Sequence, residues 1–581
     1  MKDAIRISLL VVFLYLPTGA AGQLTYWLNT DEGNWHAPNN WTDGVPIAGW
    51  TAHVNNDGQA HIDQNGGACR YLYLGYGAGQ TGRLRISHET AQLTLYLPHV
   101  GYSGVGEVLH QEGTVTATLE ARFAYSPGSY GAYTLENGTF DVLGAEYLGY
   151  DGHAAFTQYG GTHNVATWLF LAYDDESEAT YDLYDGDLNA ADIRVGDEGI
   201  ATFSQYGGAV VATNGLYVGM DVGTAESHYI LVDGELTAAV ESVGETAPGR
   251  FTQMGGTNTI TGSLTLGGSN GYHYPECRGT YLLHAGTLQV NGGFLLADEA
   301  RNNLFEQYGG TLTVGATFYV GFYGPTYSNA KGRYRAYAGR LEATRLHIGR
   351  GGCYGYFDLR TPSPEIHISE WLLLDQFAVV RAVPGCRIQM GAAAFNVDDR
   401  VTESYVDGLR NIEFVFDGGS GAVATVEVAG IDYGPTMSGY AENDGNFKLG
   451  ALTLGGDDVG QVQLVDNQVH QYGSDEAVYV NRLTVGAGCL LDLNGYNLYY
   501  VEGTIDPSAT ILNGTPTPVL AGDHDGDQDI DADDWVAFSG CLAGPGDGVE
   551  VDCAPFDFDT ESDIDLIDVA QMQQAFTGPL P

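Results

Sequence analysis

The stretch FTQYGGT at residues 156–162 returns as FSQYGGA at 203–209, FTQMGGT at 251–257 and FEQYGGT at 305–311, with LHQEGTV at 109–115 as a degenerate first copy. Their glutamines, in chain order, are Gln111, Gln158, Gln205, Gln253 and Gln307, spaced by 47, 47, 48 and 54 residues. A second phrase, such as YDLYDGDLNA at 181–190, lies between the copies. Each unit of about 47 residues therefore consists of two similar half-units.

The phrases of the repeat alternate apolar and polar residues and are separated by Gly, Asn or Asp, which predicts short strands joined by turns. A half-unit of about 23 residues matches one coil of a parallel β-helix, in which coils stack about 4.8 Å apart. The repeat therefore predicts a mainly β protein with a right-handed parallel β-helix, or solenoid, over residues 66–355. A β-propeller is the alternative, because a 47-residue unit could form a four-stranded blade. The similarity of the half-units favours the solenoid.

Stacking of the coils predicts ladders of equivalent side chains. The recurring glutamines are expected to satisfy their amides through such a ladder, and the Gly-Gly after each one is expected to turn a corner with positive φ. Acidic residues also recur in the turns, at Asp151, Asp174, Asp197, Asp221 and Glu245. They are typical of exposed turns. If the coils stack in register, they form a carboxylate row, which raises the hypothesis of a calcium-binding edge.

Composition and charge limit the possible functions. The formal net charge is −50, which argues against nucleic acid or an anionic membrane as a partner. A hydrophobic content of 44% supplies enough core to argue against wholesale disorder. Residues 1–22 carry Lys2 and Arg6, then an apolar run and small residues, and predict a secretory signal peptide. We therefore expect a secreted or extracellular protein that is released or is held at a cell surface by partners, and that is not inserted in a membrane.

The flanks of the repeat differ from it in composition. Residues 23–65 hold Trp27, Trp35 and Trp41 among several asparagines and predict a cap over the open end of the solenoid. A carbohydrate-binding platform, which would also use such aromatic residues, is the alternative. This segment resembles the Trp/Asn-rich start of secreted bacterial β-solenoid repeat proteins of the autotransporter-like or PEP-CTERM-like kind. Residues 356–512 predict a less regular β-rich continuation, and the Pro/Thr-rich residues 513–521 predict a linker.

Two acidic stretches near the C-terminus share one pattern. DHDGDQDIDADD at 523–534 and DFDTESDIDLID at 557–568 place acidic residues at offsets 1, 3, 5, 7, 9 and 12, where a calcium loop carries its ligands. The residues at these offsets are Asp523, Asp525, Asp527, Asp529, Asp531 and Asp534 in the first stretch, and Asp557, Asp559, Glu561, Asp563, Asp565 and Asp568 in the second. The pattern predicts two calcium ions. A solvated acidic tail is the alternative.

Each acidic stretch is expected to lead into a helix. Ile530 and Ile564 occupy offset 8 of the two loops. Apolar residues follow at matching positions, namely Trp535, Phe538 and Leu542 after the first loop and Val569, Met572 and Phe576 after the second.

The doubled loop and helix, with Asp at the last loop position, resembles a type I dockerin module and covers about residues 522–578. The resemblance implies a small α-helical domain at 522–581 with EF-hand-like loops. It also implies two bound calcium ions, a cohesin-like partner and a role in assemblies that degrade polysaccharides. In this resemblance offset 7 contributes a backbone carbonyl and the other offsets contribute side chains. The sequence departs from the pattern at Gln528 and Ser562, which stand where glycine is usual, and at offsets 10 and 11, which lack a Ser/Thr pair.

Seven cysteines are few for a disulfide scaffold of this length. Cys541 and Cys553, twelve residues apart between the two helix-forming segments, are the pair expected to form a disulfide. The others, Cys69, Cys277, Cys353, Cys386 and Cys489, are scattered and are expected to be buried small side chains.

The sequence favours a secreted, non-catalytic scaffold or adhesion protein that is tethered through its calcium-binding module to a cohesin-like or other cell-surface protein. The densest acidic run of the repeat, residues 174–178, has no basic partner nearby for acid–base chemistry. The alternative is a component of an extracellular complex that binds or degrades polysaccharide. If the protein is an enzyme, a carbohydrate-active hydrolase or lyase is expected.

Overall fold

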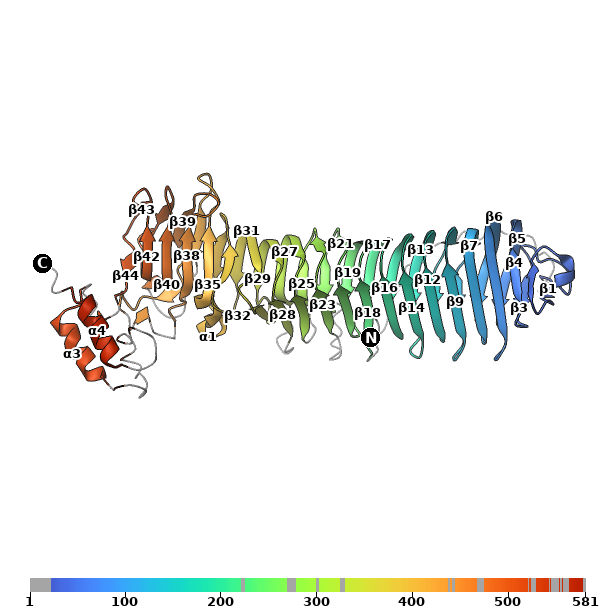
Figure 1. Cartoon of the computed structure of the whole chain (residues 1–581), viewed down its shortest axis with the longest axis horizontal. Coiled ribbons are helices and arrows are strands. Elements are labelled where there is room, and N and C mark those ends of the chain that lie inside the picture. The colour runs from blue at the N-terminus through green and yellow to red at the C-terminus, as the bar shows by residue number, and fades with distance from the viewer. Residues whose placement is uncertain are drawn as a thin grey trace, which may run out of the picture.

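The chain is mainly β, with 55% of its residues in strands and 7% in helices, and its strands wind into a parallel β-solenoid of about 15 turns (Figure 1). The computed structural model describes residues 22–220, 225–268, 278–298, 302–323, 330–436, 439–440, 445–467, 475–520, 522–523, 529–542, 544, 553, 556, 558 and 564–577. A stack of this many turns is about 70 Å long at the usual strand spacing. Most of the predicted signal peptide lies outside the described residues.

The strands form three faces that run the length of the rod. The first face contains the strand before each Gly-Gly corner: β2 (Glu32–Asn34), β4 (Gln59–Ile62), the first parts of β6 (Thr81–Val100) and β7 (Val105–Ala117), β9 (Tyr130–Leu135), β12 (His153–Gln158), β14 (Glu178–Leu183), β16 (Ile200–Gln205), β18 (Ser227–Leu231), β20 (Gly249–Gln253), β23 (Gly279–Leu283), β26 (Asn303–Gln307), β28 (Lys331–Ala336), β30 (Tyr354–Leu359) and β32 (Ala378–Ala382).

The second face follows the Gly-Gly corner. It contains the first part of β5 (Asn65–Leu74), the middle of β6, the second part of β7, β10 (Thr139–Val142), the first parts of β13 (Thr162–Leu171), β15 (Asp187–Val195), β17 (Ala209–Val218) and β19 (Glu235–Val243), β21 (Thr257–Ile260), β24 (Thr287–Val290), the first parts of β27 (Thr311–Tyr323), β29 (Arg340–Ile348) and β31 (Glu365–Leu374), β33 (Cys386–Gln389), β35 (Ile412–Phe416) and β38 (Leu449–Leu454).

The third face contains β1 (Leu24–Tyr26), β3 (Thr51–Val54), β8 (Ala121–Phe123), β11 (Glu146–Leu148), β22 (Leu264–Leu266), β25 (Phe294–Asp298), β34 (Ala394–Val397), β36 (Ala424–Glu427), β39 (Gln461–Val465), β41 (Leu490–Asp492) and β43 (Thr510–Leu512), with the last part of β6 and the second parts of β5, β13, β15, β17, β19, β27, β29 and β31. The remaining elements are β37 (Gly430–Ile431), β40 (Glu476–Val485), β42 (Asn497–Ile505), β44 (Thr517–Pro518), η1 (Pro38–Asn40), α1 (Glu403–Val406), η2 (Asp407–Asn411), α3 (Ala532–Cys541) and α4 (Leu566–Ala575).

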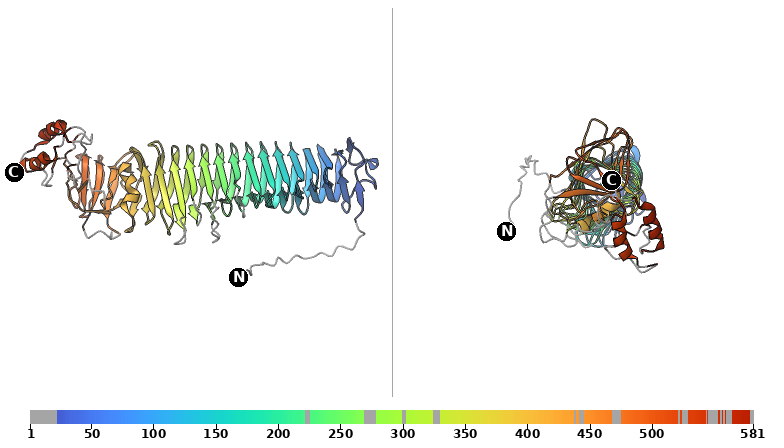
Figure 2. Two further views of the ribbon diagram at one scale, coloured as in Figure 1. Left: turned by 90° about the horizontal axis from the view of Figure 1, so that it is seen from below. Right: turned by 90° about the vertical axis from the view of Figure 1, so that its left-hand side faces the viewer.

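Parallel pairing decides between the two predicted architectures. Among the described residues, every pairing of named strands is parallel except β37 with β40. A propeller blade is antiparallel, so the alternative of a β-propeller is wrong and the solenoid is confirmed. The side view shows successive coils stacked along a single axis (Figure 2).

The first face stacks the two phrases of the repeat on each other. Tyr181 of β14 pairs with Phe156 of β12 on one side and Phe203 of β16 on the other, and both ring centroid distances are 4.7 Å. These rings belong to a ladder of alternating Tyr and Phe in the core. The 47-residue unit is therefore two coils, as the half-unit similarity predicts.

The glutamines do not stack on one another, which corrects the expected amide ladder. Gln205 stands between Leu183 and Leu231 in the register, because successive glutamines are two coils apart. Its Oε1 accepts a hydrogen bond of 2.7 Å from the Tyr229 hydroxyl, and its Nε2 donates to the carbonyl oxygens of Gly208 and Glu235. Gln158, Gln253 and Gln307 repeat this arrangement. Each glutamine therefore bonds a tyrosine of the next coil.

The first glutamine of the series does not occupy this position. His110 pairs with Leu135 in the register, and its Nδ1 lies 2.8 Å from the Tyr133 hydroxyl. Gln111 instead receives a hydrogen bond from Arg85 on the exterior. The Gly-Gly corners match the expectation, since Gly161 and Gly208 have φ of 71° and 67°.

The predicted carboxylate row is out of register. Leu148, Leu171, Val195 and Val243 occupy equivalent strand ends. Asp151 and Asp174 lie three positions after the strand ends Leu148 and Leu171, whereas Asp197 and Glu245 lie two positions after Val195 and Val243. Asp197 pairs with Arg194 at 2.6 Å. Asp221 lies outside the described residues. The hypothesis of a calcium-binding edge built on a continuous row is therefore wrong.

Two buried polar networks interrupt the apolar core at matching places. Glu241 pairs with Leu216 and Leu264 in the register, and its Oε2 accepts a hydrogen bond of 3.1 Å from Asn258. Four coils earlier Glu146 stands in the same column, and its Oε2 lies 2.7 Å from Nε2 of His163. Burial raises the pKa of Glu241 to about 8.

The N-terminal segment already belongs to the parallel stack, since β1 pairs with β3 and β2 pairs with β4. Trp27, Trp35 and Trp41 are buried at this end of the core, and Trp41 packs edge-on against the other two at 4.9 Å. Of the described residues, no helix is both long enough and apolar enough to cross a membrane.

The link between Gln205 and Tyr229 gives a first prediction. We expect Gln205→Leu to lower the free energy of unfolding by about 2 kcal/mol, because it leaves the buried Tyr229 hydroxyl without its acceptor. Leucine fits the site, since Leu183 and Leu231 occupy it in the neighbouring coils. The double variant Gln205→Leu with Tyr229→Phe should recover most of that loss, because removing both partners of a buried pair is nearly neutral. Urea unfolding followed by circular dichroism measures the free energy of unfolding of both variants. A loss in the double variant equal to the sum of the two single losses would contradict the prediction.

Candidate metal centre

The C-terminal helices begin with the same capping arrangement. Asp531 is the N-cap of α3, and its Oδ1 accepts a hydrogen bond from the backbone N–H of Asp533 while its own N–H donates to Asp534 Oδ2 at 2.8 Å. Asp565 and Asp568 repeat this box at α4, with a distance of 2.9 Å. A carboxylate at a helix start satisfies free N–H groups. The repeated Asp-x-x-Asp therefore explains where both helices begin.

The two halves are linked through the isoleucines at loop offset 8. The N–H of Ile530 donates to the Thr577 hydroxyl after α4, and the Thr577 N–H donates back to the carbonyl oxygen of Ile530. The N–H of Gly544, which follows α3, donates to the carbonyl oxygen of Ile564. Each loop is therefore hydrogen-bonded to a residue that follows the helix of the other half. Sequence reasoning missed Thr577, although a hydroxyl two residues past a helix is a common polar partner.

Apolar packing joins the helices into one small core. Its buried members are Ile530, Phe538, Phe556, Ile564 and Met572, and Trp535 and Val569 pack against it. The predicted apolar positions therefore face inward except for Leu542 and Phe576, which are exposed. A disulfide joins Cys541 to Cys553, with the Cα atoms 5.5 Å apart.

The remaining cysteines of the described residues, namely Cys69, Cys353, Cys386 and Cys489, are buried and unbridged. Cys277 lies outside the described residues.

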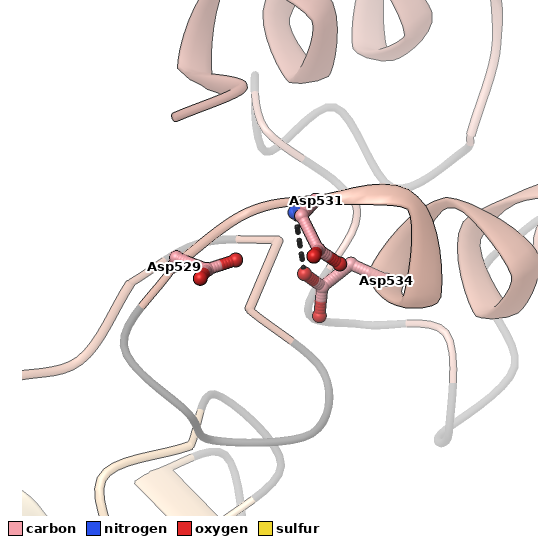
Figure 3. Close-up of side chains that lie close together, drawn as sticks. All are labelled: Asp529, Asp531 and Asp534. Carbon is pink, nitrogen blue, oxygen red and sulfur yellow. Dashed lines mark hydrogen bonds between the residues drawn. The ribbon is translucent and has the colours of Figure 1, made fainter. Parts of the chain in front are cut away.

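The first acidic stretch gathers three carboxylates. One carboxylate oxygen of each of Asp529, Asp531 and Asp534 lies within 4.8 Å of the other two (Figure 3). Asp523, Asp529 and Asp534 are buried, and in the second stretch Asp568 is buried at 0% exposure. No lysine or arginine follows Arg482 in the chain, so these charges have no basic side chain from their own segment. Hydrogen bonds, a cation or a proton can stabilise a buried carboxylate, and Asp568 accepts hydrogen bonds from the N–H groups of Phe558 and Asp565. Oxygen-only ligands suit calcium.

The structure places only part of each predicted ligand set. Asp523, Asp529, Asp531 and Asp534 of the first loop, and Asp565 and Asp568 of the second, are described. Asp525, Asp527, Asp557, Asp559, Glu561 and Asp563 lie outside the described residues, as do Gln528 and Ser562.

No family model, curated protein or solved structure matches the chain, so its function is argued from its own residues.

Proposed function

We propose that the protein is a secreted, non-catalytic β-solenoid rod that a C-terminal, calcium-dependent module resembling a type I dockerin tethers to a partner protein. The observation that carries this proposal is the matched pair of Asp-capped helices, linked reciprocally through Ile530 and Ile564. In this proposal Asp531, Asp534, Asp565 and Asp568 hold calcium as well as capping the helices. The partner is a cohesin-like or other cell-surface protein.

The exposed apolar residues of α4 support a docking role. Leu566 is 80% exposed and Ile567 is 49% exposed at loop offsets 10 and 11. Two adjacent exposed aliphatic side chains gain free energy when a partner removes them from water. The equivalent residues of α3, Ala532 and Asp533, offer no such surface. The second half of the module is therefore the proposed contact.

A capture experiment with the full chain tests the tether. The immobilised protein should retain a partner from the extracellular fraction of its own source in calcium and release it in chelator. Leu566→Ser with Ile567→Ser should lower the retained amount by about tenfold, because it removes two buried aliphatic contacts. Val536→Ser is the matched control, since Val536 is 70% exposed on the other helix. If neither chelator nor the double variant lowers the amount of retained partner, the proposal is refuted.

A further inference from the structure

A groove on the outer side of the first face gathers basic residues on an otherwise acidic rod. Its cavity has a volume of about 470 Å³. Its described lining includes Arg250, Arg278, Lys331 and Arg333, with Glu306 as the carboxylate among them. The whole chain has only 23 lysines and arginines and a net charge of −50. Four cations therefore gather at one groove of an acidic protein, although Glu226 and Asp358 lie beside three of them.

The register fixes where these cations stand. Arg250 of β20 pairs with Thr280 of β23, Thr280 pairs with Leu304 of β26, and Leu304 pairs with Arg333 of β28. Three strand spacings separate the two arginines, which is about 14 Å. Thr280 and Leu304 form a floor without charge between them. The cations are therefore spread along the rod axis, which suits a chain with repeated anionic groups better than a single small anion.

Neighbouring side chains hold the arginines in place. Glu226 lies 3.1 Å from Arg250 Nε and 3.0 Å from an Arg278 guanidinium nitrogen. The Arg333 guanidinium lies 4.7 Å from the centre of the Tyr356 ring, and its Nε lies 3.9 Å from Asp358 Oδ2. A guanidinium has five N–H donors, so these neighbours leave donors for a ligand. Lys331 forms no ion pair with any other described residue.

The groove coincides with a break in the repeat. The connection from β15 to β16 spans residues 196–199, whereas that from β22 to β23 spans residues 267–278. This longer connection is the reason that Gln253 and Gln307 are 54 residues apart. Departures from a regular pattern are where functional sites are expected. Arg278 lies at the end of this longer connection.

We propose that this groove binds an acidic polysaccharide, with its carboxylate or sulfate groups on the arginines and its sugar rings over Thr280 and Leu304. Bidentate recognition by guanidinium suits both anionic groups. Among the described lining residues there is no aromatic side chain on which a nucleic acid base could stack, which favours a glycan over a nucleic acid. This inference concerns the rod and does not depend on the calcium-dependent tether.

Calorimetric titration of the full chain, in chelator, tests the groove. The probes are a hexameric oligouronate, a sulfated hexasaccharide, a neutral hexasaccharide and a single-stranded 12-mer oligonucleotide. One or both acidic glycans should bind, with an affinity that falls as salt rises, and the other two should not. The two acidic probes tell carboxylate from sulfate recognition.

Variants localise the binding. Arg250→Gln with Arg333→Gln should weaken it at least about tenfold, as expected for two charge-assisted contacts. Lys331→Gln should weaken it without changing the unfolding midpoint, because Lys331 has no ion pair among the described residues. Arg345→Gln is the control, since Arg345 pairs with Glu370 on another face. No binding of either acidic glycan at about 1 mM, binding that the groove variants leave unchanged, or equal binding of the oligonucleotide would overturn the proposal. Partner capture in calcium should be the same for all three variants, which separates this result from failure of the tether.

Discussion

Chelation of calcium is expected to expose the backbone of α3 and α4 to solvent exchange while leaving the solenoid protected. A ligand present at 100 times its dissociation constant stabilises the folded state by about 2.7 kcal/mol. Hydrogen exchange of residues 530–541 and 564–577 should therefore speed up by about 100-fold when calcium is removed. The strands of the first face serve as the internal reference, because their buried ladders involve no proposed calcium ligand.

A pair of substitutions separates metal binding from helix capping. Asp531→Asn with Asp534→Asn removes two charges from the cluster of three, but asparagine caps a helix about as well as aspartate. We expect the variant to lose calcium binding at the first loop by about 100-fold, because calcium affinity depends on the number of charged ligands.

Asp533→Asn is the matched control for this variant, since Asp533 is exposed on the same helix and stands at no ligand offset. Calcium titration calorimetry measures the affinity, and exchange measures the helix. Unchanged calcium binding in the double variant would show that these residues only cap the helix.

The period of the repeat was enough to predict a parallel stack, because a half-unit of about 23 residues can close one coil. It was not enough to predict the partners of the glutamines. Identical residues recur every second coil, so the Gln205 amide meets Tyr229 of the other phrase. A ladder of like residues needs a period of one coil. The pattern that reveals this pairing is the alternation of Phe-x-Gln with Tyr-x-Leu along the chain.

The basic groove could not be predicted from sequence for a different reason. Arg250 and Arg333 are 83 residues apart and lie in different strands, β20 and β28. Only the register brings them to one face. The insertion before Arg278 was the available signal, since it lengthens the repeat at this place. The acidic loops were found because all of their ligands lie within twelve consecutive residues.

Raising the pH from about 5 to about 8 is expected to destabilise the middle of the rod through Glu241. Burial raises the pKa of this carboxyl to about 8 from an ordinary 4.5, so the folded state keeps a proton that the unfolded chain loses. The folded pKa is the higher one. The free energy of unfolding therefore falls as the pH rises from about 4.5 to about 8 and is level above that range.

Each pH unit within that range costs about 1.4 kcal/mol, or about 5 kcal/mol in total. Glu241→Gln should remove this dependence, because glutamine is neutral at every pH and still accepts the hydrogen bond from Asn258. Glu235→Gln is the control, since Glu235 is exposed on the same strand.

Urea unfolding of the unmodified protein and of both variants is measured at several pH values between about 5 and 9, together with hydrogen exchange of β19. The free energy of unfolding of Glu241→Gln should exceed that of the unmodified protein by an amount that grows as the pH rises. A constant difference across the range would mean that Glu241 is ionised when folded, and that the core around Asn258 and Tyr281 accommodates a charge. Because Leu216 and Leu264 flank Glu241 in the register, a carboxyl that stays neutral is the arrangement that the physical chemistry of this core favours.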